Sequence, residues 1–169
     1  FDTDTRAEKV KEIIKDITKK PVKTIIYTHS HPDHCGGAAV FKDTVEEIIA
    51  FEPVKTPLAR TDELSEILFK RLSRQFGHNL TDAEVITQGL GIREGVAVGE
   101  GKRAFLPPTT TYKNEKVKRI IDGVSLELVP AVGETDDQIF IWLPDSTVPG
   151  CGDNYYGSFP NLYAIRGSQ

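Results

Sequence analysis

The spacing of apolar residues predicts helices mainly in the first half of the chain. Apolar side chains at i, i+3, i+4 and i+7 predict an amphipathic helix over residues 3–19, which Pro21 closes. The same spacing predicts a second amphipathic helix over residues 61–75, with Thr61 as its N-cap. A further helix is expected to begin near Gly37, where small apolar residues follow.

Runs of β-branched and aromatic residues predict strands, most of them in the second half. Residues 22–28 and 48–51 are expected to be short buried strands. An Asp-Gly pair between two apolar runs predicts a hairpin with a two-residue turn. The strands predicted in this half are 117–121, 124–129 and 139–143, with 147–151 as a candidate partner. The glycine-rich stretch 76–108 is expected to be loop, so the whole pattern predicts a mixed α/β chain.

The amino-acid composition is that of an ordinary globular protein, and the net charge disfavours some classes of binding partner. The 169 residues are 38% hydrophobic and 27% charged, with a net charge of −4. This length suits one domain, and the mild acidity argues against nucleic acid as the main partner. The longest apolar runs are far shorter than the roughly 20 residues that span a bilayer, so no membrane span is predicted. Cys35 and Cys151 are expected to be free thiols.

One segment concentrates metal-binding side chains directly after the first predicted strand. Three of the four histidines of the chain fall between residues 29 and 34, together with one aspartate. His29 and His31 would point to the same side of an extended segment, so both can bind one ion. A turn at Pro32 would then bring Asp33 and His34 round to a second ion. Imidazole and carboxylate ligands together suit zinc, iron or manganese.

This segment resembles the His-x-His-x-Asp-His motif of the metallo-beta-lactamase superfamily, with Thr28 before it and Gly36-Gly37 after it. The resemblance implies an αββα sandwich, α/β in class, with a binuclear metal site at its edge. It does not fix a reaction, because the superfamily includes lactamases, lactonases, nucleases, sulfatases and oxidoreductases.

The second half of the chain resembles the alkylsulfatase branch of that superfamily. The resembling segments are 133–138, 152–154 and the Asn-Leu-Tyr-x-x-Arg-Gly run at 161–167. The ligands that the resemblance implies are His29, His31 and Glu134 for one ion, Asp33 and His34 for the other, and Asp153 as a bridge. Asp33 and Asp153 would be the catalytic carboxylates, although the family carries Glu where this chain has Asp153. Two zinc ions are the expected cofactors.

The residues alone leave some of these assignments open. Asp136 lies two positions from Glu134 and competes with it for the ligand role, and Asp153 could simply form a turn. For the substrate, the resemblance implies that Asn161 and Arg166 contact a sulfate group. Gly77, in a Phe-Gly pair, stands where the family has Tyr-Gly near the sulfate.

The sequence therefore predicts a metal-dependent hydrolase of alkyl sulfate esters, with a small-molecule substrate. Another hydrolase of the same fold (a lactamase, lactonase or phosphodiesterase) and a partial domain without catalysis remain alternatives. Residues 1–169 are expected to be one domain that is incomplete at both ends, since it opens at Phe1 without methionine and stops before a last family histidine. A homo-oligomer is expected to cover the open sheet edge. No signal-peptide pattern is visible, which leaves cytoplasm and periplasm open.

Overall fold

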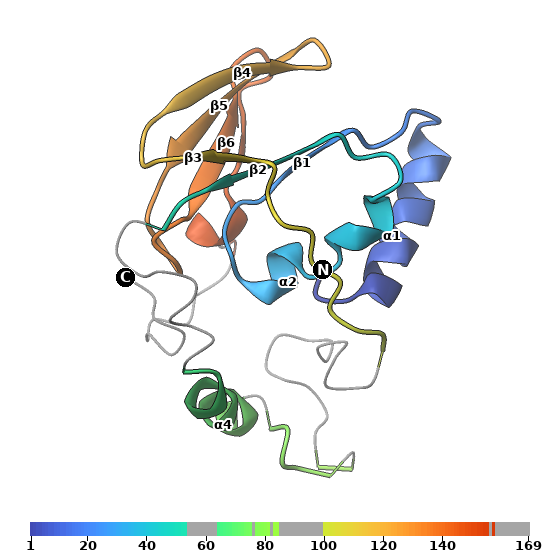
Figure 1. The fold of residues 1–169 in the computed structure, drawn as a ribbon, viewed down its shortest axis with the longest axis vertical. Helices are drawn as coiled ribbons and strands as arrows, with labels where there is room; N and C mark the ends of the chain where they lie inside the picture. The colour runs from blue at the N-terminus through green and yellow to red at the C-terminus, as the bar shows by residue number, and fades with distance from the viewer. Residues whose placement is uncertain (54–63, 76, 82, 85–99, 156, 158–169) are drawn as a thin grey trace.

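The computed structural model describes residues 1–53, 64–75, 77–81, 83–84, 100–155 and 157 (Figure 1). Its helices are α1 (Asp4–Ile17), α2 (Pro32–Cys35), the 3-10 helix η1 (Ala38–Phe41), α4 (Ser65–Gln75) and the 3-10 helix η3 (Gly152–Asn154). Its strands are β1 (Thr24–Ile26), β2 (Glu47–Phe51), β3 (Thr110–Tyr112), β4 (Val117–Ile121), β5 (Val124–Pro130), β6 (Ile139–Leu143) and β7 (Val148–Gly150).

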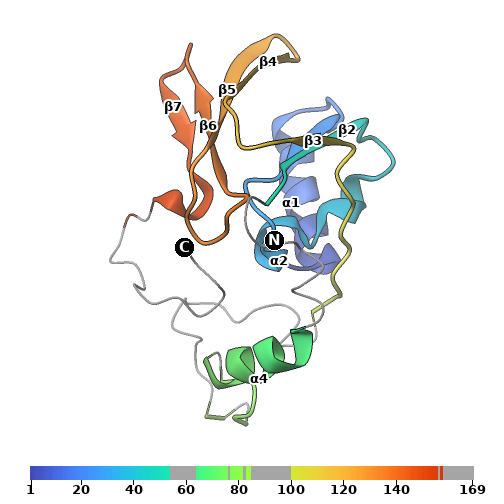
Figure 2. The same ribbon diagram turned by 60° about the vertical axis from the view of Figure 1, so that its left-hand side comes forward.

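The strands form two sheets that face each other (Figures 1 and 2). The first sheet is parallel, in the order β1-β2-β3, so the carboxyl ends of its strands meet at one edge. The second is an antiparallel meander in the order β4-β5-β6-β7. The predicted hairpin is confirmed: β4 and β5 pair in register, and Asp122 and Gly123 both have positive φ, 50° and 81°, as a type I′ turn requires.

Strand β2 is buried on both faces, which explains its uninterrupted apolar run. Ile49 and Phe51 point into the core between the sheets, where they meet Leu128 and Ile139 of the second sheet. The alternate β2 residues point the opposite way, into a second cluster with Tyr27, Cys35 and Ala38. A strand covered by a sheet on one side and helices on the other has no solvent face, so polar alternation is lost.

Helix α1 packs against η1, which lies on the outer side of the parallel sheet, and the apolar stripe of α1 is only partly buried. The Thr3 hydroxyl accepts a hydrogen bond from the Arg6 amide and caps the helix. Ala7 is fully buried, and a Cβ on Gly37 would lie 2.6 Å from the Ala7 Cβ, so the helix rests directly on the glycine pair. Ile13 and Ile17 are 57% and 80% exposed.

The described elements thus supply one helical layer and both sheets of the expected αββα arrangement. None of the described helices covers the outer face of the β4–β7 sheet, where Ile120 is 74% exposed (Figures 1 and 2).

Two of the strand predictions made from the sequence need correction. The strand expected at 22–28 is limited to Thr24–Ile26, and β3 forms where no strand was expected. Across the described residues, no helix has the length and apolar character that a membrane span requires.

Candidate metal centre

Three separate loops carry the predicted ligands to one edge of the sandwich. His29 and His31 follow β1, and the chain then enters α2, whose first turn holds Asp33 and His34. Glu134 lies in the loop between β5 and β6, and Asp153 lies in η3 after β7. Strand β1 is parallel to β2 and continues directly into the histidine segment, so His29 and His31 lie at the carboxyl edge of the parallel sheet.

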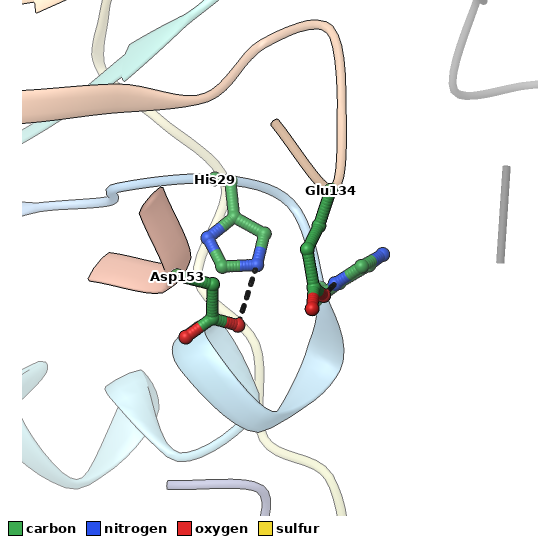
Figure 3. Close-up of side chains that lie close together, drawn as sticks. His29, Glu134 and Asp153 are labelled. Carbon is green, nitrogen blue, oxygen red and sulfur yellow. Dashed lines mark ion pairs between the residues drawn. The ribbon is translucent and has the colours of Figure 1, made fainter. Parts of the chain in front are cut away.

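Four of these side chains form a tight group (Figure 3). One ligand atom from each of His29, His31, Glu134 and Asp153 lies within 4.8 Å of the others. His31 Nδ1 is 2.9 Å from Glu134 Oε2, and His29 Nε2 is 3.7 Å from Asp153 Oδ2. The rings of His29 and His31 are 4.8 Å apart, so the alternate residues of the segment do face the same side.

The other two predicted ligands lie against this group through Asp153. His34 Nε2 is 2.9 Å from Asp153 Oδ2 and 3.5 Å from Asp33 Oδ2. The His29 and His34 rings are 4.2 Å apart. The Asp153 carboxylate therefore touches both histidine sets, which is the position that a bridging ligand would need.

The donor set fits a divalent cation. His29 is 1% exposed, and its buried Nε2 makes no hydrogen bond with any described residue. The Thr28 hydroxyl lies 3.2 Å from His29 Nδ1, so a proton on Nδ1 leaves the Nε2 lone pair directed at the carboxylates. Two imidazole nitrogens and two carboxylate oxygens are ligands that zinc, iron and manganese accept.

The histidines of this site differ in protonation: His29 is neutral, whereas His34 is charged. Burial, followed by the proximity of His34 and His31, lowers the pKa of His29 to about 4, so this ring is neutral at pH 7. Burial would also lower the pKa of His34, but the hydrogen bonds that His34 donates to the Asp153 and Asp33 carboxylates outweigh this effect and raise the value to about 9. The His34 hydrogen bond in turn lowers the pKa of Asp153. The pair is therefore ionised in the absence of metal.

The structure separates Glu134 from its rival Asp136. Asp136 and Asp137 are 8% and 7% exposed and line a small pocket with Phe51 and Glu52 at the end of β2. Asp137 accepts a hydrogen bond from the Ser30 hydroxyl at 3.2 Å. Glu134, not Asp136, supplies an oxygen to the four-residue group.

A family comparison agrees with the histidine motif. The family model of the metallo-beta-lactamase superfamily matches residues 1–156. The chain belongs to the metallo-beta-lactamase superfamily.

Relatives within this superfamily include alkylsulfatases. A linear primary-alkylsulfatase of Pseudomonas sp. (strain ATCC 19151) is 29% identical over 97% of the chain and 32% of its own length. An alkyl/aryl-sulfatase of Saccharomyces cerevisiae is 30% identical over 99% of the chain and 27% of its own length. A solved double mutant of the sec-alkyl sulfatase PisA1 matches 100% of the chain and 28% of its own, with a TM-score of 0.73 at 22% identity, which supports the metallo-beta-lactamase fold. The chain spans about a third of the length of these relatives.

Of the three predicted substrate contacts, the structure describes only Gly77. Asn161 and Arg166 lie outside the described residues. Gly77 lies two residues after the end of α4, a helix that lies apart from the two sheets in Figures 1 and 2. Its φ of 67° and the hydrogen bond from the His78 amide to the Ser73 carbonyl, 2.9 Å long, give it the glycine position of a Schellman helix end.

Sequence reasoning missed the polar residues that surround this metallo-beta-lactamase centre. Gln138 is 1% exposed, and its side-chain oxygen accepts from the Glu134 amide at 2.7 Å. Asn154 donates to the Ala131 carbonyl at 2.9 Å. The available signal was position: Gln138 opens an apolar strand, where a buried amide is unusual, and Asn154 directly follows a predicted ligand.

Proposed function

We propose that the chain carries the metal centre of a hydrolase that acts on alkyl sulfate esters. The observation that carries the proposal is the group of His29, His31, Glu134 and Asp153, in which carboxylates stand beside two histidines. The alkylsulfatases named above resemble the chain across nearly all of its length.

We assign the first ion to His29, His31 and Glu134, the second to Asp33 and His34, and the shared position to Asp153. Zinc is the proposed metal, and divalent ions bound there would act as Lewis acids and lower the pKa of a water. The protein's own part is to keep His29 neutral and buried and to hold Asp153 against both histidine sets. Asp33 and Asp153 are the proposed catalytic carboxylates.

Asn161 and Arg166 are the proposed contacts of the sulfate group. A sulfate monoester has one negative charge and several acceptor oxygens, which suits a guanidinium fork and a neutral amide donor. Gly77 remains a proposed substrate neighbour, although its place at a helix end already explains the glycine.

The test combines metal analysis with release of inorganic sulfate from dodecyl sulfate. We expect about two equivalents of zinc per chain and sulfate release that a chelator abolishes and added zinc restores. His29→Ala should lose the first equivalent. His78→Ala is the matched control, because His78 stands beside α4, and it should keep full stoichiometry.

The outcomes separate the alternatives. Two bound metals without sulfate release, but with turnover of a β-lactam, a lactone or a phosphodiester, would move the proposal to another hydrolase of this superfamily. Metal binding without any turnover would favour a partial domain. Unchanged zinc stoichiometry in His29→Ala would contradict the ligand assignment itself.

We also propose that residues 1–169 act as one metallo-beta-lactamase-like domain. The family match over residues 1–156 and the apolar cluster shared by both sheets support this unit. Two sheets that bury their inner faces against each other cannot be separated without exposing that cluster.

A further inference from the structure

The loop that carries Glu134 is closed by one buried side chain. The backbone of Gln138 accepts from the Ala131 amide at 2.9 Å, so the two ends of the loop are joined. Within the loop, the Gln138 side-chain oxygen accepts a hydrogen bond from the Glu134 amide at 2.7 Å. The next residue, Ile139, donates to the Thr28 carbonyl at 2.9 Å, which ties the loop to the residue before His29.

A second amide side chain ties the Asp153 turn to the same loop. Asn154 Nδ2 donates to the Ala131 carbonyl at 2.9 Å. Gly133 lies between the two amides: a Cβ there would stand 2.8 Å from Gln138 Oε1 and directly against Asn154 Oδ1. The turn that carries Asp153 is therefore in direct contact with the Glu134 loop through Asn154, while Gln138 holds that loop from within.

We propose that Gln138 and Asn154 are positioning residues that fix the separation of the Glu134 and Asp153 carboxylates. The proposal rests on the metal centre proposed above. The Glu134 and Asp153 side chains are 32% and 21% exposed, so packing alone does not hold them. Metal–ligand distances tolerate only about 0.2 Å of error, so the backbones beneath the carboxylates must be held firmly. Gln138 is 1% exposed and binds the Glu134 amide, so it acts through Glu134.

The test compares metal affinity, metal geometry and stability in three variants of the full chain. Gln138→Met keeps most of the side-chain shape and loses the acceptor, and Asn154→Ala loses the donor from an exposed position. Tyr112→Phe is the control. It removes the hydroxyl that accepts a 2.7 Å hydrogen bond from Arg119 between the two sheets, and it leaves the loops that carry Glu134 and Asp153 unchanged. Affinity is measured by competition with a chromophoric chelator, geometry by the absorption bands of bound Co²⁺, and stability by urea unfolding.

We expect Gln138→Met and Asn154→Ala to weaken the binding of Zn²⁺ and Co²⁺ by about tenfold or more and to change the Co²⁺ bands. Tyr112→Phe should lower the urea midpoint without altering either metal readout. If Gln138→Met does not fold, the exposed Asn154→Ala change still decides the question. Wild-type affinity and bands in the folded variants would overturn the positioning role and leave the proposed function standing. A wild-type chain that binds no metal would overturn both.

Discussion

The ion pair between His34 and Asp153 makes a specific contribution to the stability of the metal-free protein. The pKa of His34 is about 9 against an ordinary 6.5, because the hydrogen bonds that His34 donates to Asp153 and then Asp33 outweigh the effect of burial. At about 1.36 kcal/mol per pKa unit, this displacement is worth roughly 3 kcal/mol. Both side chains are less than a third exposed, at 26% and 21%, so solvent screening removes only part of it.

The sign of the pH dependence follows from the raised pKa. A group that binds its proton more tightly in the folded state stabilises that state fully below its unfolded pKa, here 6.5. The contribution is lost as pH rises through about 9. Asp153→Asn should therefore destabilise the metal-free protein at pH 6 and have little effect at about pH 9.5.

The assay is urea unfolding in a chelator at these two pH values. Because Asp33 still lies 3.5 Å from His34, we expect Asp153→Asn to lose about 2 kcal/mol at the lower pH, less than the full amount. With a slope of about 2 kcal/mol per molar urea, the midpoint falls by about 1 M. Asp145→Asn, which removes an exposed carboxyl at the other end of β7, is the control. Equal losses at both pH values in Asp153→Asn would refute this reasoning.

Three further predictions concern the core, the thiols and the assembly. Leu128→Ala should cost about 2–5 kcal/mol of unfolding free energy because Leu128 is fully buried, whereas Ile120→Ala, at 74% exposure, should stay within about 0.5 kcal/mol in the same urea titration. An aromatic disulfide reagent at pH 8 should label Cys151 in the folded chain and reach Cys35 only in urea, because burial raises the pKa of Cys35 to about 11; rapid labelling of both would contradict this. Solution scattering should show a homo-oligomer, and a monomer would count against a covered sheet edge.

Elements defined by local chemistry could be predicted from the sequence, and elements defined by distant pairing could not. The hairpin around Asp122-Gly123 was predicted because the turn residues themselves set the register. Strand β3 was missed because its three residues, Thr110–Tyr112, have no period of their own and become a strand by pairing with Ile49, Ala50 and Phe51. The apolar stripe of α1 predicted the helix correctly, but it could not tell how much of that stripe other elements cover.

In the metal centre, too, the features set by local sequence could be predicted, and those set by contacts between loops could not. His29 and His31 lie on one extended segment, so their spacing alone predicts that they face one ion. The choice between Glu134 and Asp136 depends on how a loop folds, and in the folded loop the buried Gln138 side chain accepts a hydrogen bond from the Glu134 amide. That contact lies within one loop, whereas the hydrogen bond from Asn154 to Ala131 joins residues 23 positions apart, and no local sequence pattern indicates either of them.

Counting charge at the centre connects the donor set to the class of substrate. Metal ligation requires unprotonated imidazoles, so the charge of the donor set would be the −2 of the Glu134 and Asp153 carboxylates. This charge would cancel one divalent cation and leave little attraction for an anionic ester. A second cation held by Asp33 and a neutral His34 would add two positive charges against one carboxylate, so the centre would become net positive. If the proposed substrate is correct, binding of a sulfate monoester would require both ions, or cationic side chains in place of the second. Sulfate release that saturates at one equivalent of zinc would contradict the two-ion requirement and shift the task to Arg166.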